Sequence, residues 1–207
     1  MSGRPTSDPA FWDARYVGPD LAFGDGPNAF IAEEAPRLGA GARVLDLGAG
    51  EGRNAVFLAR RGCDVTALDF ATAGLERATA WAAREGLRLD VEGADLTDWA
   101  APEAAYDGVV CTFVHLLASE LPAMWAAIER TLRPGGVLLG EWFAPRNLRL
   151  GGPGPTALDR LVSANEVRAS LRGGRLVVCR EVERVLDEGP FFQGRAATAQ
   201  IVFEREG

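Results

Sequence analysis

The sequence predicts a doubly wound α/β fold, with a mostly parallel sheet of seven strands that ends in an antiparallel β-hairpin. The first observation behind this prediction is an alternation of short apolar stretches and helix-like stretches between residues 43 and 143, which is typical of βαβ units. The second is a glycine-rich turn directly after the first apolar stretch. The third is a pair of long strand-like stretches near the C-terminus with no helix between them, which predicts a hairpin.

The N-terminal part reads as an arm followed by a helix. Residues 1–26 are rich in Gly, Pro and Asp, yet they carry the aromatic side chains of Phe11, Trp12, Tyr16 and Phe23. We therefore expect this arm to pack against the domain. Ala29–Leu38 is expected to be a helix, because Pro27-Asn28 precedes it and Gly39 follows it.

The central part supplies the parallel strands and their connecting helices. The expected strands are Arg43–Leu47, Asp64–Leu68, Leu87–Gly93, Gly108–Phe113 and Val137–Phe143. The expected helices are Arg53–Arg61, Ala73–Glu85 and Leu121–Leu132. Glycines close most of these elements, and the run Arg133-Pro-Gly-Gly136 is expected to separate the last helix from the strand after it.

The C-terminal part begins with a Gly/Pro-rich stretch, Arg146–Pro155, which is either a lid over the active end of the sheet or a disordered connection. Ser163-Ala-Asn-Glu166 has the spacing of a capping box and predicts a short helix. The hairpin is expected from Leu176–Leu186 and Ala196–Glu204.

Composition limits the possible functions. The chain has 207 residues and a net charge of −7, which argues against a free nucleic-acid-binding protein. All 22 basic residues are Arg, and the absence of Lys excludes a Schiff base or a Walker-type phosphate lysine. The cysteines lie far apart and predict reduced thiols in a cytoplasmic protein: Cys63, Cys111 and Cys179. We expect no signal peptide, no membrane span, no metal site and either a monomer or a homodimer.

The glycine turn is the most informative segment. Val44 to Asn54 reads as a strand that runs through Gly48-Ala49-Gly50-Glu-Gly52 directly into a helix, so the backbone can approach a ligand at the positive end of that helix. A dinucleotide fingerprint needs a glycine where this chain has Arg53. Asp46 would repel a pyrophosphate but suits an ammonium group. The alternative is an ordinary glycine-rich turn between a strand and a helix.

Two further acids are expected beside this turn, because the carboxyl ends of parallel strands share one edge of the sheet. Asp69 ends the second strand, where a carboxylate can accept hydrogen bonds from both ribose hydroxyls. Asp95 and Leu96 follow the third strand and suit an adenine amino group and ring, and Phe70 is either on the adenine face or in the core. Together these residues outline an adenosine pocket.

Val44–Asn54, Asp69, Ala94-Asp95-Leu96 and Leu132–Gly136 together resemble class I S-adenosylmethionine-dependent methyltransferases over about residues 10–145. The motifs Phe11–Tyr16 and Phe23–Phe30 are similar to those of the small bacterial tellurite-resistance and thiopurine-type group. This resemblance implies a Rossmann-like fold and S-adenosylmethionine as cofactor, with S-adenosylhomocysteine as product. It also implies that the arm closes over the cofactor, with Arg15 and Tyr16 near the methionine end and Asn28 nearby.

The tail also resembles that group, through Val185-x-x-Glu188-Gly189 and the hairpin, but this chain has Phe191-Phe192-Gln193 where relatives often carry a His. One domain is therefore expected. It comprises a cofactor-covering arm and helix (1–42), a cofactor-binding core (43–145), and a lid loop with the hairpin (146–207).

Methyl transfer from a sulfonium is an in-line displacement, in which the protein chiefly positions the nucleophile and excludes water. The loop after the fourth strand, Thr112-Phe113-Val-His115, is expected near the methyl group. His115 is the candidate catalytic base, and the alternative is a strand-end histidine bonded to the backbone. Glu141 either binds a cationic substrate or pairs with an arginine, and pairing is the favoured interpretation.

These inferences give one set of candidate cofactor-binding residues: Arg15, Tyr16, Asn28, Asp46, Gly48, Ala49, Gly50, Gly52, Asn54, Asp69, Phe70, Asp95, Leu96, Thr112 and Phe113. The favoured function is methyl transfer to a small-molecule acceptor whose nucleophile is positioned by the loops after strands four and five. A sensor or scaffold that binds S-adenosylmethionine without turnover fits the same residues. A nicotinamide-dependent oxidoreductase is disfavoured, since the glycine register fails and no Tyr-x-x-x-Lys pair exists.

Overall fold

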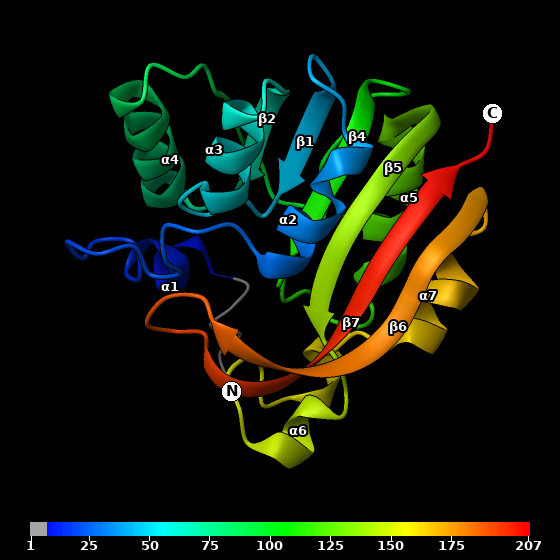
Figure 1. Cartoon of the computed structure of the whole chain (residues 1–207). Coiled ribbons are helices and arrows are strands. Elements are labelled where there is room, and N and C mark those ends of the chain that lie inside the picture. Colours follow the sequence, from blue (N-terminus) through cyan, green and yellow to red (C-terminus); the bar gives the residue numbers. More distant parts are fainter. Residues whose placement is uncertain (1–7) are drawn as a thin grey trace.

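The computed structural model describes residues 8–207 and contains one sheet with strand order β3-β2-β1-β4-β5-β7-β6. The parallel strands are β1 (Arg43–Leu47), β2 (Asp64–Asp69), β3 (Asp90–Gly93), β4 (Tyr106–Thr112) and β5 (Leu132–Phe143). β6 (Gly174–Asp187) and β7 (Gln193–Arg205) form the antiparallel hairpin, and β7 also pairs antiparallel with β5. The predicted fold class is confirmed (Figure 1).

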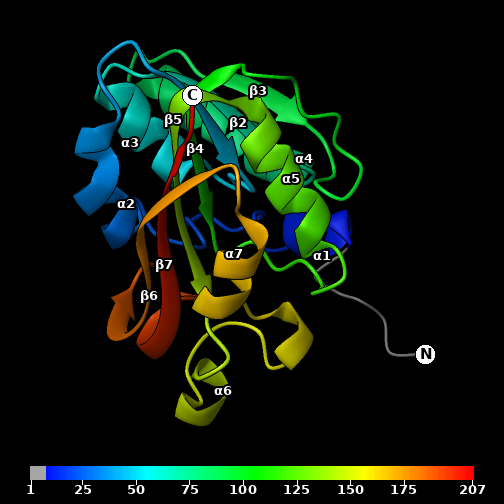
Figure 2. The same cartoon turned by 90° about the vertical axis from the view of Figure 1, so that its right-hand side faces the viewer.

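Helices cover both faces of the sheet. One face packs against α2 (Ala29–Glu34), α3 (Arg53–Arg60) and α4 (Thr72–Arg84), and the other packs against α5 (Leu121–Thr131) and α7 (Ala164–Ser170). Figure 2 shows α2 and α3 on the opposite side of the sheet from α5 and α7. The remaining helical segments are α1 (Pro9–Asp13), α6 (Asn147–Leu150) and two 3-10 turns, Ala35–Arg37 and Leu158–Arg160.

Two main apolar clusters hold these layers together. Leu45, Met124 and Ile128 belong to the cluster under α5, and Val44, Leu58 and Val110 belong to the cluster under α3. β1 contributes to both, because its successive side chains point to opposite faces and both faces are buried. This burial explains why β1 and β4 read as nearly continuous apolar runs.

Several element boundaries differ from the predictions. The third strand begins at Asp90 instead of Leu87. Leu87 and Leu89 lie before it and pack against side chains of α3 and α4. The expected separation at Arg133–Gly136 is present, although β5 is counted from Leu132, which pairs with Tyr106. The next pair is Gly108 with Val137, so Arg133–Gly136 bulge out of the ladder, with a positive φ at Gly135.

The stretch Arg146–Pro155 is held in place by hydrogen bonds of one side chain, that of Asn147. Asn147 is buried, its Nδ2 donates to the Pro153 carbonyl, and its Oδ1 accepts from the Ala197 amide. The alternative of a disordered connection is therefore wrong. The capping box is confirmed, with Ser163 and Glu166 bonded reciprocally at the start of α7.

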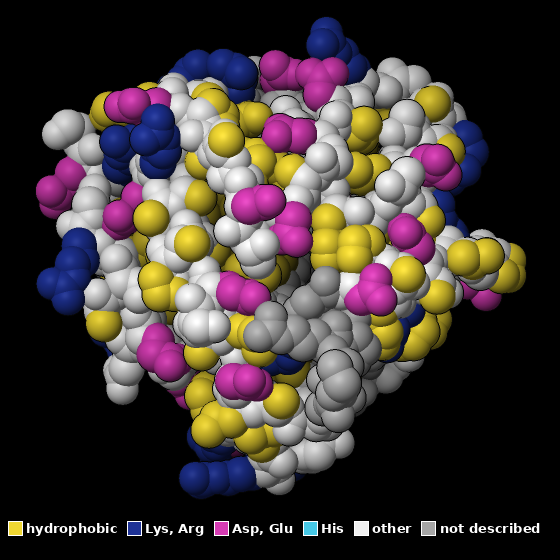
Figure 3. Space-filling model, turned by 180° about the vertical axis from the view of Figure 1, so that it is seen from behind, with side chains coloured by type: hydrophobic (Ala, Val, Ile, Leu, Met, Phe, Trp, Pro, Cys, Tyr) yellow, Lys and Arg dark blue, Asp and Glu magenta, His cyan; other side chains and the backbone are white. Residues whose placement is uncertain are grey.

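Figure 3 shows the molecule from behind, with acidic side chains scattered over the middle of that face and arginines toward its edges. On that face no continuous basic surface of the kind that follows a nucleic-acid backbone is present. In residues 8–207, no helix is long and apolar enough to cross a membrane.

Candidate functional site

A cavity that is partly open to solvent lies at the carboxyl ends of β1, β2 and β4. This is the edge of a parallel sheet at which α/β proteins bind ligands. The structure brings most of the predicted site residues together in its wall: Tyr16, Gly48, Ala49, Gly50, Asn54, Asp69, Phe70, Asp95, Leu96, Thr112, Phe113 and His115.

The glycine turn after β1 uses backbone conformations that favour glycine. Gly48, Gly50 and Gly52 have φ values of 67°, 53° and 84°. A Cβ atom on Gly52 would lie 2.6 Å from the Ala78 Cβ, so the absence of a side chain lets α3 and α4 pack together. A Cβ on Gly48 would collide with the Val114 side chain. Gly48 lines the cavity, whereas Gly52 supports the turn from outside the cavity wall.

Asp69 connects the end of β2 to this turn. One carboxylate oxygen accepts from the Gly50 amide and the other accepts from the Ala71 amide, both at 2.8 Å. Burial raises the pKa of Asp69, while these backbone hydrogen bonds act in the opposite direction. Each oxygen keeps acceptor capacity toward the cavity, because a carboxylate oxygen has two lone pairs.

Asp46 lies behind the glycine turn and does not itself line the cavity. Its side chain is buried and its Oδ2 has no hydrogen-bond partner. Burial raises the pKa of Asp46 to about 7, although the nearby Arg53 favours the ionised form. An orphaned buried oxygen at this position is an acceptor that a donor entering from the cavity side could satisfy, directly or through water.

Arg15 and Asn28 also lie outside the cavity wall. The Arg15 guanidinium stacks 3.6 Å from the centre of the Phe11 ring and lines a separate hollow beside Phe191. Asn28 is fully buried, caps α2 by accepting from the Ile31 amide, and donates from Nδ2 to Glu141. The backbone amide of Asn28 donates to the side-chain oxygen of Asn54, and Asn54 Nδ2 donates to Thr112. Hydrogen bonds therefore connect Asn28 to two residues of the cavity wall.

Asp95 and Leu96 lie at the rim, in the loop after β3. Asp95 is exposed, and its Oδ1 accepts from the amide and hydroxyl of Thr97. Its second carboxylate oxygen remains available to a ligand, and Leu96 adds an apolar surface beside it.

Aromatic rings form the far wall. Phe113 contacts Phe143 and Phe192 with ring centres 4.6 Å and 4.8 Å apart, and Phe23 lies 4.6 Å from Phe192. Phe113 has a φ of 53°, which is strained for a bulky side chain. Such strain concentrates at functional sites, and Phe113 and His115 both line the cavity.

His115 is half-buried between Trp12 and Phe143, with ring centres 5.7 Å and 6.0 Å away. Its Nε2 is buried without a hydrogen-bond partner. Burial lowers the pKa of His115 to about 3, with Arg160 and Arg15 acting in the same direction. The imidazole is therefore neutral at physiological pH, and its Nε2 is available for a hydrogen bond with a ligand.

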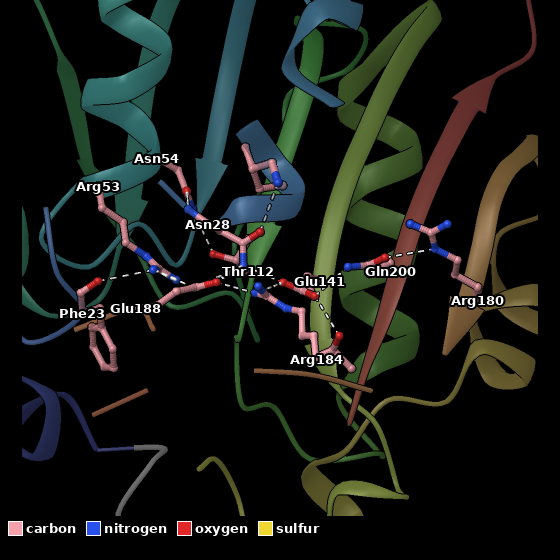
Figure 4. Close-up of polar contacts among 12 residues, drawn as sticks. Phe23, Asn28, Arg53, Asn54, Thr112, Glu141, Arg180, Arg184, Glu188 and Gln200 are labelled. Atoms are coloured by element: carbon pink, nitrogen blue, oxygen red, sulfur yellow. Dashed lines mark hydrogen bonds and ion pairs between the residues drawn. The ribbon is translucent and has the colours of Figure 1, made fainter. Parts of the chain in front are cut away.

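Glu141, at the end of β5, is the centre of a buried polar network (Figure 4). It accepts from Asn28 and Arg184 on one oxygen, at 2.6 Å and 2.8 Å, and from Thr198 and Gln200 on the other, at 2.7 Å and 3.0 Å. The interpretation that Glu141 pairs with an arginine is confirmed, and its bonds leave little capacity for a cationic substrate.

The network continues to the cavity through Glu188. Arg184 also pairs with Glu188, and Glu188 Oε2 accepts from Arg53 at 2.8 Å. Arg53 lines the cavity, as do Trp12, Phe23 and Phe192, none of which we predicted as a site residue. The aromatic motifs of the arm were a signal for Trp12 and Phe23, whereas no local pattern connects Arg53 with Glu188.

A family model described as a methyltransferase domain matches residues 44–136, which include the glycine turn, Asp69 and Asp95. This central part of the chain is therefore similar to methyltransferase domains. The expected resemblance to class I S-adenosylmethionine-dependent methyltransferases is thereby confirmed.

Curated relatives match over about half of this chain. The ubiquinone biosynthesis O-methyltransferase of Xanthomonas axonopodis is 35% identical over 100 residues, which are 48% of this chain and 42% of that protein. Malonyl-[acyl-carrier protein] O-methyltransferase of Serratia marcescens is 37% identical over 110 residues, or 53% and 41%. Hemagglutinin 1 of Eikenella corrodens is 38% identical over 105 residues, or 50% and 35%. The matches thus span less than half of each relative.

Solved structures share the fold across nearly the whole chain. A protein from a study of the conversion of a disulfide bond into a thioacetal group during echinomycin biosynthesis has a TM-score of 0.76 at 23% identity, covering 96% of this chain and 90% of that one. TehB from Haemophilus influenzae has a TM-score of 0.73 at 19% identity, covering 98% and 67%. The [4+2]-cyclase SpnF has a TM-score of 0.72 at 18% identity, covering 99% and 98%.

Proposed function

We propose that this chain transfers a methyl group from S-adenosylmethionine to a small-molecule acceptor by in-line displacement. The observation that carries the proposal is the convergence of the glycine turn, Asp69 and an aromatic wall containing His115 on one cavity. The methyltransferase-domain match over residues 44–136 supports it independently.

The residues present fit this cofactor. Gly48 and Gly50 leave the turn without side chains, and Asp69 would accept hydrogen bonds from the ribose hydroxyls. Asp95 and Leu96 would hold the adenine. The unpartnered oxygen of Asp46 would accept from the ammonium group, directly or through water.

When bound, the sulfonium supplies an activated methyl carbon, so the protein needs mainly to position the nucleophile and exclude water. Phe113 and Phe192 form an apolar part of the cavity wall, and Phe143 packs against both rings. His115 Nε2 would accept a hydrogen bond from the nucleophilic group and so orient it. A soft nucleophile would need no more, whereas a hydroxyl or amine could give its proton to His115 only if ligand binding raised the pKa of the imidazole from about 3.

A sensor or scaffold that binds S-adenosylmethionine without turnover is the second candidate. One observation favours keeping it: SpnF has the same fold over 98% of its own length and is described as a [4+2]-cyclase, so the fold alone does not imply methyl transfer. The proposal also includes a cytoplasmic location, no nucleic-acid or membrane partner, and a monomer or homodimer.

The test is calorimetry with S-adenosylmethionine, S-adenosylhomocysteine and NADH, followed by an acceptor screen that detects S-adenosylhomocysteine formation. We expect micromolar binding of the first two compounds and none of NADH, and turnover with at least one acceptor that His115→Ala slows. Binding without turnover across thiol, amine, hydroxyl and oxyanion acceptors would favour the sensor. Absence of binding to either sulfur compound would overturn the proposal.

A further inference from the structure

Two segments that lie far apart in the sequence meet beside the cavity: residues 21–24, here called the strap, and residues 188–192, here called the hairpin tip. The Phe191 amide donates to the Ala22 carbonyl at 3.3 Å. The rings of Phe23 and Phe192 are 4.6 Å apart, and both line the cavity. The strap and the hairpin tip therefore share one stretch of the cavity wall.

Their backbones touch at a pair of glycines. Gly24 and Gly189 have φ values of 75° and 78°. A Cβ on Gly189 would collide with the Gly24 nitrogen and with the Phe23 backbone, and a Cβ on Gly24 would lie 3.1 Å from the Gly189 nitrogen. Both glycines are thus needed for the close approach as well as for their backbone conformation.

One guanidinium binds both segments. Arg53 Nη1 donates to Glu188 Oε2 at 2.8 Å and to the Phe23 carbonyl at 3.3 Å. Arg53 and Glu188 are buried, with 8% of each residue exposed, so solvent screens their pair only weakly. Because Arg53 is the first residue of α3, directly after the glycine turn, it links this shared wall to the proposed cofactor site.

We propose that the strap and the hairpin tip act as one cover over the cavity, and that Glu188 is the positioning residue that anchors this cover to Arg53. Opening the hairpin tip should then release the strap as well, although the two segments lie at least 164 positions apart in the sequence. The prediction for ligand release rests on the proposed function, whereas the coupling between the two segments does not.

The coupling is tested on the ligand-free chain by amide hydrogen exchange. In Gly189→Ala the new Cβ collides with the strap, whereas in Gly194→Ala it meets nothing within 4 Å, and the two glycines have similarly positive φ values of 78° and 103°. Gly194→Ala is therefore a matched control for backbone strain. We expect Gly189→Ala to speed exchange about tenfold in both the strap and the hairpin tip. Unchanged exchange in the strap, or equal exchange in both variants, would overturn the proposal.

The anchoring role is tested with Glu188→Gln, which keeps the side-chain shape but removes the charge that faces Arg53 and Arg184. The control is Glu183→Gln on β6, the strand that leads into the hairpin tip, which loses only its pairs with the exposed Arg146 and Arg195. Stopped-flow release of S-adenosylhomocysteine should become about tenfold faster in Glu188→Gln and stay within about twofold in the control. Equal release rates in the two variants would remove Glu188 from this role.

The two proposals fail in distinguishable ways. If the wild-type chain binds no S-adenosylhomocysteine but exchange in the strap and the hairpin tip rises together, the cofactor assignment falls and the cover remains. If the ligand binds but only the hairpin tip responds to Gly189→Ala, the cover falls and the cofactor assignment remains. Melting temperatures of all four variants show whether each one folds.

Discussion

The Gly50 amide donates a hydrogen bond of 2.8 Å to the Asp69 carboxylate, and this bond joins the glycine turn to the end of the neighbouring strand. Asp69 therefore has two functions in the proposed site: it fixes the turn and it offers its remaining lone pairs to the ribose. Asp69→Ala should weaken S-adenosylmethionine binding by about 1–3 kcal/mol, because buried donors lose their acceptor. Calorimetry measures this, with Asp64→Ala at the exposed start of the same strand as the control. An effect of a few tenths would mean that Asp69 is not the ribose partner.

Gly50 is the position at which an added methyl group has the clearest consequence. A Cβ there would lie 2.8 Å from the Tyr16 hydroxyl, in a backbone with a φ of 53°. Gly50→Ala should weaken cofactor binding more than tenfold, since either the turn or the arm must move. Gly62→Ala is the control for backbone strain, because Gly62 has a φ of 83° but a Cβ there would meet only the Ala40 Cβ, at 3.7 Å. Adding Tyr16→Phe to Gly50→Ala should restore part of the affinity, and no recovery would show that the hydroxyl contact is not the cause.

The low pKa of His115 predicts that the folded chain loses stability in acid. In the unfolded state an imidazole takes up a proton below about pH 6.5, but the folded state holds the pKa of His115 near a value of about 3. Stability that is present above pH 6.5 is therefore lost as the pH falls toward 3. Urea unfolding between pH 7 and 4 should show a smaller loss in His115→Gln than in the wild type. Parallel curves for the two chains would contradict a buried neutral imidazole.

The contribution of Asp46 to stability depends on pH in the opposite direction. Its folded pKa is raised from 3.8 to about 7, so the folded state keeps a proton that the unfolded state has already lost. Stability present below about pH 4 is therefore lost as the pH rises toward 7. Asp46→Asn should be more stable than the wild type at pH 7.5 and close to it at pH 4, as measured by urea unfolding. A constant difference across this range would refute the shift.

Glu141 should matter more for stability than any exposed carboxylate. Glu141→Ala removes the acceptor of four buried donors and leaves Arg184 with one carboxylate fewer, which should lower the free energy of unfolding by about 3–5 kcal/mol. Glu103→Ala removes an exposed pair with Arg130 at 3.7 Å and should cost less than about 1 kcal/mol. Denaturant titration compares the two, and equal costs would show that the network contributes little.

The predictable part of the site came from residues whose roles follow from local order. Asp69 and Asp95 could be placed because Asp69 ends one strand and Asp95 closely follows another, and parallel strands end at one edge of the sheet. The same rule located His115, but its low pKa could not be foreseen, since that depends on Trp12 and Phe143 from other segments enclosing the ring.

Arg53 and Glu188 show where such reasoning ends. They lie 135 positions apart and meet only because the hairpin curls back beneath the sheet (Figure 1). Asn28 is a different case. The resemblance placed it near the cofactor, but its hydrogen bond to the buried Glu141 holds it behind the residues that line the cavity. Long-range charge pairing of this kind leaves no periodic signal in a single sequence.

The position of β7 has a consequence for the order in which the chain can fold during synthesis. β7 follows β6 in the chain but lies between β5 and β6 in the sheet. While the ribosome is still making residues 193–205, β5 has one edge without a hydrogen-bonding partner, and β6 has no place on the sheet at all. The nascent chain therefore exposes an open sheet edge, a known route to aggregation, until its last strand emerges and closes it.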